Sequence, residues 1–388
     1  MIKPKINVNA FLLCFIILRF CFPFIALSQD RHLAENKAQQ YYTLNDFYSV
    51  KKFDTHIHLN TYQDVFIKQA QRDNFCFLDI VDDRPFGLPM EGQQKIAIYD
   101  VKRFPKTMVF ATTFSVKNWG DKDWAEQTIA SLKQSFSDGA RAVKIWKNIG
   151  MSLRDKNGRF VMVDDPGLKP VLDYLEKGHI AVIAHNGEPK DCWQPLDKMA
   201  FGKDYYGEHP EYHMYLHPDY PTYNDQIDAR DNMLTKHPDL NFVGAHLGTL
   251  EWSLDELAKR LDKFPNMSVD LSRMPYLQLH ALRNWQKTRD FFIKYQDRLL
   301  YGTDMAINDT KIPEELEKET HATWLSDWKF YVTDDKINLP GYGNLRGVKL
   351  PKSVIDKIYL KNAERWLSIK ARSRKLGYTL KWNFKRCH

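Results

Sequence analysis

Eight short apolar segments recur along the chain, and they constrain its fold more than any other feature. They cover Phe53–Ile57, Phe75–Ile80, Thr107–Thr113, Ala140–Trp146, Ile180–His185, Asn241–His246, Met267–Leu271 and Leu299–Thr303. Most are continuously apolar, which is typical of strands that are buried on both faces. Such strands occur in parallel sheets covered by helices, so the chain is predicted to be an α/β protein.

The segments between these strands carry apolar residues at helical spacing. The clearest are Trp124–Phe136, Leu168–Lys177, Asp225–Lys236, Leu254–Phe264, Leu282–Tyr295 and Val354–Leu367. Eight strands, each followed by a helix, are typical of a (β/α)8 TIM barrel. A doubly wound open sheet is the main alternative, but no glycine-rich phosphate loop follows the first strand.

Two connections are too long for simple turns, namely residues 186–223 after the fifth strand and 305–350 after the eighth. Both are rich in aromatic residues. Long ordered loops of this kind usually serve as lids or binding loops. In a barrel they would overhang the carboxyl-terminal face, where the chemistry takes place.

The N-terminus reads as an export signal followed by one large domain. We expect a signal peptide over residues 1–28, a leader over 29–50, the barrel over 51–372 and a C-terminal tail over 373–388. The first segment has a basic start, an apolar run and a small-x-small cleavage site. This predicts a periplasmic or extracellular protein with no membrane span once the signal is removed. An uncleaved membrane anchor is the alternative, although Arg19 in the run would be costly.

Charge excludes one class of partner. The formal net charge is +7, part of it in the signal segment, and no basic stripe with interleaved aromatics is present. Nucleic-acid binding is therefore not expected. We expect a small-molecule substrate as the partner.

Residues that bind metals or transfer protons stand at the ends of the predicted strands. They are His56 and His58 in the first, Lys144 in the fourth, and His185, His246 and Asp304 at the ends of the fifth, sixth and eighth. Residues two apart on a strand share a face, so the first pair projects together. Singly, each could be a hydrogen-bonded core residue or a solvated loop residue. Together, they suit a divalent metal such as zinc, with an aspartate as general base.

These motifs resemble those of the amidohydrolase superfamily, and most of all its amidohydrolase-2 branch, which includes metal-dependent decarboxylases and lactone hydrolases. The resemblance covers about residues 50–370 and includes Gly302-Thr303-Asp304 and an Asn-Ala pair at Asn362. It implies that His56, His58, His185 and Asp304 are metal ligands and that Asp304 is also the catalytic base. His246 would ligate a second metal or polarise the substrate. Barrels of this branch are often dimers, so a homodimer is a further expectation.

Lys144 decides the expected number of metals. In relatives with two metals a fourth-strand lysine is carboxylated and bridges them, and His246 would then join the second site. We expect one metal, most simply Zn²⁺, with an unmodified Lys144, because the amidohydrolase-2 branch is commonly mononuclear. Manganese or iron would also suit histidine and carboxylate ligands.

Further residues at the predicted barrel mouth are candidates for substrate binding. They are Lys144, Lys147, Glu188 and Arg273. Glu188 could instead hold a histidine ligand or neutralise Lys144, and Arg273 could clamp a carboxylate. The histidines of the long fifth loop, His209, His213 and His217, are expected at the surface.

Three functions remain open from the sequence. The first is a metal-dependent hydrolase that cleaves a C–N or C–O bond of a small, anionic amide, lactone or ester. The second is a non-oxidative decarboxylase on the same site. The third is a binding protein that has kept the barrel and lost the chemistry.

Overall fold

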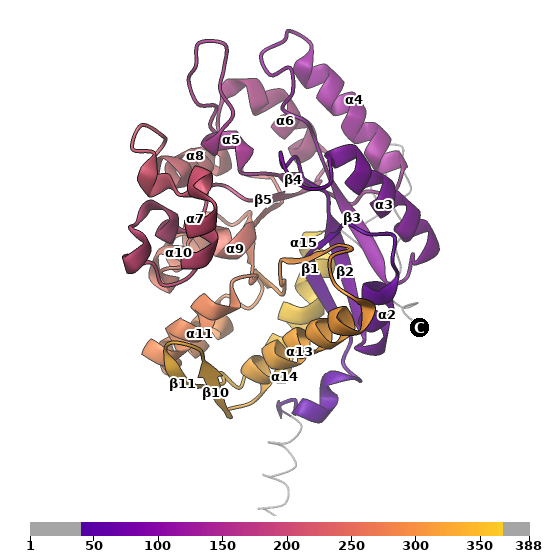
Figure 1. Cartoon of the computed structure of the whole chain (residues 1–388), viewed down its shortest axis with the longest axis vertical. Helices are drawn as coiled ribbons and strands as arrows, with labels where there is room; N and C mark the ends of the chain where they lie inside the picture. The colour runs from indigo at the N-terminus through magenta and orange to yellow at the C-terminus, as the bar shows by residue number, and fades with distance from the viewer. Residues whose placement is uncertain (1–39, 368–388) are drawn as a thin grey trace, which may run out of the picture.

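The computed structural model describes residues 40–367, and its centre is a parallel sheet (Figure 1). The sheet order is β8-β7-β6-β5-β4-β3-β2-β1-β9, and every neighbouring pair is parallel. Its strands are β1 (Lys52–Leu59), β2 (Phe75–Ile80), β3 (Met108–Thr113), β4 (Ala142–Ile145), β5 (Ala181–Ala184), β6 (Phe242–Gly244), β7 (Met267–Asp270), β8 (Leu299–Leu300) and β9 (Met305–Ile307). The eight predicted strands are all present.

The sheet closes on itself through the last strand, which is split into β8 and β9. β8 pairs with β7, and β9 pairs with β1. Between the two pieces, the Thr55 N–H donates to the Tyr301 carbonyl at 2.9 Å and the Asp304 N–H donates to the His56 carbonyl at 2.8 Å. The ring excludes the doubly wound open sheet and confirms the TIM barrel.

Helices surround the strands (Figure 1). They are α2 (Val65–Arg72), α3 (Met90–Arg103), α4 (Trp124–Ser137), α5 (Asn148–Met151), α6 (Lys169–Lys177), α7 (Lys203–Glu208), α8 (Tyr223–Lys236), α9 (Ala245–Gly248), α10 (Leu254–Lys263), α11 (Met274–Arg283), α12 (Trp285–Lys294), α13 (Pro313–Val332), α14 (Lys352–Asp356) and α15 (Asn362–Trp366). All six predicted helices are found, the last of them broken by a π-helical turn, Lys357–Lys361, between α14 and α15.

The prediction of one long loop over 305–350 is wrong in part, because this segment holds α13 and a hairpin of β10 (Lys336–Leu339) and β11 (Gly343–Arg346). Helix α13 begins with a proline at its first turn, followed by two glutamates, which favour a helix start. It buries Trp324, Trp328 and Tyr331, while its charged residues other than the buried Asp327 are exposed or half-buried. The charged face hides this helix from a reading based on apolar character alone.

Two apolar layers hold the barrel. One lies between the sheet and the helices, and the other fills the interior with small strand residues such as Ala111, Ala142 and Ala181. Trp366 of α15 packs against the interior layer. The interior is therefore closed to a ligand at this level, and the polar residues collect at the carboxyl end.

The predicted N-terminal segments are described only in part. Residues 1–28, most of the leader and the tail 373–388 lie outside the described residues. Residues 41–47 pack on the barrel, with Phe47 fully buried and Tyr41 bridged to Pro351. Within residues 40–367, no helix is both long and apolar enough to cross a membrane.

Candidate active site

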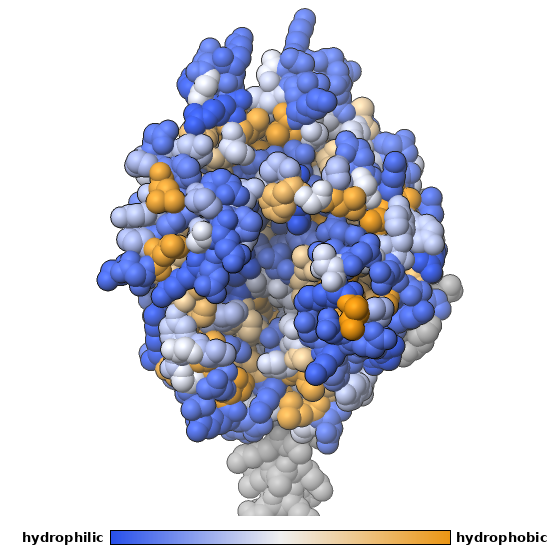
Figure 2. Space-filling view, viewed as in Figure 1, coloured by the Kyte–Doolittle hydropathy of each residue, from blue (hydrophilic) through white to orange (hydrophobic). Residues whose placement is uncertain are grey.

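A cavity of about 670 Å³ opens at the carboxyl ends of the strands, and the molecule is visibly hollowed there (Figure 2). All nine predicted site residues line it: His56, His58, Lys144, Lys147, His185, Glu188, His246, Arg273 and Asp304. They come from six different strand ends. His56 and Asp304, which are 248 positions apart in the sequence, are therefore neighbours in the cavity.

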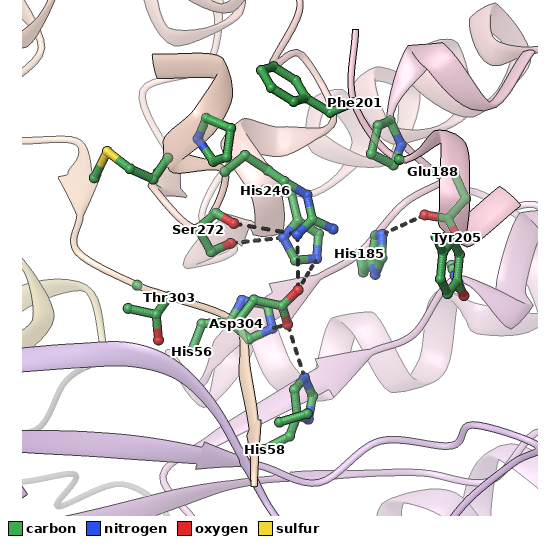
Figure 3. A pocket seen from close by; sticks show the side chains of 18 of the residues that line it. His56, His58, His185, Glu188, Phe201, Tyr205, His246, Ser272, Thr303 and Asp304 are labelled. Carbon is green, nitrogen blue, oxygen red and sulfur yellow. Dashed lines mark hydrogen bonds and ion pairs between the residues drawn. The ribbon is translucent and has the colours of Figure 1, made fainter. Parts of the chain in front are cut away.

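A β-bulge in β1 determines the direction of the His56 and His58 side chains. The pairing register between β1 and β2 shifts between Asp54 and Ile57. Phe53 packs in the barrel interior, while Ile57 packs in the layer beneath the helices. The extra residue thus changes which positions of β1 face inward. Above the bulge, His56 and His58 point into the cavity (Figure 3).

Asp304 lies at the centre of the cluster (Figure 3). Its carboxylate is 3.3 Å from His56 Nε2, 3.5 Å from His58 Nε2 and 3.8 Å from His246 Nε2. Arg273 Nη1 donates to it at 3.1 Å. Burial acts to raise the pKa of Asp304, but the surrounding histidines and Arg273 hold that pKa well below its ordinary value. The carboxylate is therefore ionised at neutral pH.

The far nitrogens of these histidines are all engaged, and the partners of His56 and His246 fix the tautomers of these two rings. His56 Nδ1 donates to Asp270 at 2.8 Å. His246 Nδ1 donates to Ser272 Oγ at 2.8 Å, because that hydroxyl gives its own proton to Asp270. In neutral His56 and His246 this arrangement leaves a bare lone pair on Nε2. His58 Nδ1 lies between the Ile80 carbonyl at 2.9 Å and Arg84 Nη2, a donor, at 3.0 Å, so its partners allow either tautomer.

Two lone pairs and an ionised carboxylate thus converge on one point, which is unfavourable unless a cation lies between them. Two atom groups within 4.8 Å could hold a metal here: His56, His58 and Asp304, and His56, His246 and Asp270. The second group uses a carboxylate that already orients two histidines. The donor types fit a divalent metal at the first group, with Asp270 as a supporting partner.

His185 stands beside this cluster without joining either group. Its ring lies 4.3 Å from that of His246, and its Nε2 is buried with no hydrogen-bond partner among the described residues. Glu188 is 3.7 Å away. Burial holds the pKa of His185 and that of His246 well below 6.5, so both are neutral. An unpartnered buried imidazole is what a ligand or metal would satisfy.

The two lysines have different surroundings. Lys147 pairs with Glu188, so the suggestion that Glu188 neutralises Lys144 is wrong. Lys144 is almost fully buried, and burial lowers its pKa. Its Nζ lies 3.4 Å from His56 Nε2, and no carboxylate of residues 40–367 lies within ion-pair distance of it. The His56 lone pair is therefore its nearest polar partner.

Part of the cavity wall was not predicted from the sequence. Arg84 pairs with Asp82 just after β2, and Asp82 is also 3.5 Å from His58 Nδ1. A polar run, Asp82-Asp83-Arg84, directly follows an apolar strand, and this signal was available in the sequence. Phe86 and Tyr205 add aromatic walls. Among the fifth-loop histidines, His213 is buried and donates to the Gln194 carbonyl, so its predicted surface position is wrong.

The backbone is strained at two functional positions. Asp304 has a φ of 63°, and His246 begins a run of four residues with positive φ, continued by Leu247, Gly248 and Thr249. The left-handed region costs a non-glycine residue about 1 to 2 kcal/mol. Such strain persists only where the surrounding structure imposes it, and it is typical of functional sites.

One support for Asp304 comes from β1 and α13. Asp54 is fully buried and accepts hydrogen bonds from the Thr303 hydroxyl at 2.7 Å and from the Trp324 indole at 3.0 Å. Burial raises the pKa of Asp54 to about 7. The residue next to Asp304 is therefore tied to β1 and to a helix that the sequence analysis had taken as loop.

Comparison with known proteins identifies the family of this chain. The sequence profile described as amidohydrolase, of the amidohydrolase-2 group, matches residues 118–369. The chain belongs to the amidohydrolase-2 family. This confirms the resemblance stated from the motifs. Amidohydrolases of this family generally bind a divalent metal, and this one has candidate ligand groups for it.

Solved structures agree with the fold of this amidohydrolase. An uncharacterized TIM-barrel protein, Bb4693 from Bordetella bronchiseptica, has a TM-score of 0.50 and 15% identity, covering 82% of this chain and 99% of its own. The 2,6-dihydroxybenzoate decarboxylase from Rhizobium also has a TM-score of 0.50, at 14% identity and 83% and 99% coverage. Identities this low show the fold alone. A search of curated proteins returned no match.

Proposed function

We propose that this amidohydrolase is a zinc-dependent hydrolase that cleaves a C–N or C–O bond of a small anionic amide, lactone or ester. The observation that carries the proposal is the convergence of three histidine Nε2 atoms on the ionised Asp304. His56, His58 and Asp304 would hold one divalent cation, and His185, whose Nε2 has no hydrogen-bond partner among the described residues, would be the fourth ligand. When bound, such a cation supplies Lewis acidity and acidifies a water.

Asp304 takes the proton in the proposed reaction. Its low pKa makes it an ionised acceptor at neutral pH, and its contact with Arg273 fixes its orientation. It accepts the proton of the attacking water and passes it to the leaving group. His246 presents a lone pair rather than an N–H, so in its neutral form it acts as a ligand or proton acceptor.

The cations of the wall orient the substrate. Arg84, Lys147 and Arg273 are each paired with one carboxylate, and their remaining N–H groups line the cavity. A substrate carboxylate would be held by these donors and by Lys144. Such cations stabilise a carboxylate in the ground state, and losing it as carbon dioxide would discard that interaction in the transition state. The charged wall therefore favours hydrolysis.

Decarboxylation is the second candidate, and the aromatic wall favours it. Phe86, Trp146 and Tyr205 line the cavity. They would suit an aromatic acid, and decarboxylation of such an acid needs no attacking water. We further propose export directed by residues 1–28 and a homodimer as the assembly.

The decisive experiment measures metal content per chain by elemental analysis of protein purified without chelator. About one metal, lost in His56→Ala/His58→Ala, is the expected result. About two would indicate a carboxylated Lys144 and a second site at His246. No metal after reconstitution with Zn²⁺ would overturn the proposal and leave a binding protein.

A product assay then separates the two reactions. Lactones, amides, esters and aromatic acids are incubated with the zinc-loaded protein in ¹⁸O-labelled water. Label in a new acid identifies a hydrolase. Release of carbon dioxide, together with an organic product that has lost its carboxyl group and carries no label, identifies a decarboxylase and excludes the first candidate.

A further inference from the structure

The four-residue left-handed turn at the end of β6 is held from outside the site. His246, Leu247, Gly248 and Thr249 have φ values of 55°, 59°, 64° and 60°. A left-handed turn of this length, with only one glycine, does not persist without external contacts. On the cavity side, Asp270 accepts from the His246 N–H at 2.8 Å. Ser272 Oγ accepts from His246 Nδ1 at 2.8 Å, and the Thr249 hydroxyl donates to the Asn186 carbonyl at 2.9 Å. None of these bonds uses the carbonyl of Gly248 or Thr249.

The other end of the turn is fixed by helix α8. The Tyr223 hydroxyl donates to the Thr249 carbonyl at 2.6 Å, and Arg230 Nη1 donates to the Gly248 carbonyl. Both side chains are buried, with exposed fractions of 7% and 1%. Both lie outside the cavity wall. Two consecutive carbonyls of the strained turn thus depend on two donors from one helix.

These donors are themselves oriented. The Trp252 indole donates to the Tyr223 hydroxyl at 2.7 Å, which leaves the hydroxyl proton for Thr249. Arg230 uses Nε and Nη2 on Asp231, at 3.1 and 2.7 Å, which leaves Nη1 for Gly248. The remaining donor of each side chain therefore bonds to a carbonyl of the turn.

We propose that Tyr223 and Arg230 are positioning residues for His246. They hold the turn in its left-handed conformation, and the turn directs the His246 Nε2 lone pair toward Asp304. Their contribution to the reaction rests on the function proposed above, but the conformation that they impose does not.

The first test is therefore independent of any substrate. Full-length protein labelled with ¹⁵N-histidine is compared by NMR as wild type, Tyr223→Phe, Arg230→Lys and the control Tyr295→Phe. Tyr295 is a buried tyrosine of another region whose hydroxyl bonds to Asp262. The His246 signals, assigned by their loss in His246→Asn, should shift in the first two variants and stay unchanged in the control.

Unchanged His246 signals in Tyr223→Phe would overturn the inference, even if Arg230→Lys failed to fold. The signals of His321 serve as an internal reference, because its Nδ1 bonds to Asp73 and both residues lie outside the cavity wall. A shift of all histidine signals alike would mean a general structural change and would also overturn it.

The second test uses whichever substrate the product assay identifies. Tyr223→Phe should lower kcat about tenfold and leave KM within twofold, because misplacing a functional group slows the reaction. In a His246→Asn background the same change should have less than a twofold effect. An equal loss in both backgrounds would mean a purely structural role. If wild type turns over no substrate, the proposed function fails while the NMR result still decides this inference.

Discussion

The two ends of the barrel bury charge in opposite ways. At the carboxyl end, Asp304, Asp270 and the histidines contact one another, and their hydrogen bonds leave lone pairs directed into a cavity. At the amino end, Lys52 is buried alone and donates to the Phe47 and Val50 carbonyls. Its ammonium lies 4.4 Å from the Phe47 ring and 5.6 Å from that of Trp328. All its donors are directed at the protein itself.

The difference shows how one strand serves two purposes. Lys52 and His56 are four residues apart on β1, and both are fully buried. Lys52 completes the packing at the amino end. His56 presents its Nε2 to the cavity at the carboxyl end. We therefore expect substitutions at the amino end to reduce stability, and those at the carboxyl end to reduce activity and metal binding.

The largest expected effect is at the carboxyl end. Asp304→Asn removes the proton acceptor and one metal ligand, so kcat/KM should fall by about 10³-fold or more. Thermal denaturation should stay near that of wild type. Asp309→Asn, an exposed carboxylate of the same face, is the control. Turnover within tenfold of wild type would contradict the role of Asp304.

The next largest is at the amino end. Trp328 is fully buried against Tyr42, Phe47 and Tyr359. Trp328→Leu should lower the free energy of unfolding by about 3 kcal/mol, because it leaves a cavity and strips the Thr43 carbonyl of its donor. Urea denaturation measures this. Metal content per folded chain should be unchanged, and a loss of metal would show that the two ends are coupled.

A smaller effect is expected where one carboxylate orients two histidines. Asp270→Asn weakens the bond to His56 Nδ1 and the support of the His246 N–H. Zn²⁺ affinity should fall about 10- to 100-fold, which competition with a chelator measures. Asp297→Asn, at the amino end of the neighbouring strand, should leave the affinity unchanged. Equal Zn²⁺ affinities in both variants would contradict a role of Asp270 in supporting the metal site.

The last effect, the smallest when it is expressed per unit of pH, concerns the pH dependence of stability. Burial lowers the pKa of Lys52 to about 7, from 10.5. Between these values the unfolded chain holds a proton that the folded chain lacks, so stability rises with pH by at most about 1.4 kcal/mol per unit. Urea denaturation from pH 7 to 10 should show a shallower rise in Lys52→Met than in Lys156→Met, which alters an exposed lysine. Parallel curves would contradict the lowered pKa.

The barrel and nine residues of its cavity could be predicted from the sequence. Each apolar strand that ends in a ligand-type residue can be recognised from neighbouring positions alone. The turn at His246 could not be predicted, since His-Leu-Gly-Thr contains one glycine and its conformation depends on Tyr223 and Arg230, distant in the chain. The helix α13 was not predicted for another reason, namely that its many charged residues mask its buried aromatic side. The pairing of Lys147 rather than Lys144 with Glu188 also depends on side-chain direction, which spacing does not encode.

The split eighth strand has a consequence for folding. β1 completes the ring only with Tyr301 and β9, and Tyr42 reaches Asp356 across 314 residues. Loop closure over such separations is entropically costly and slow. The chain must therefore be synthesised past Ile307 before the ring can close. Until then the edge of β1 is unpaired, and this makes it the part of the unfinished chain most open to aggregation.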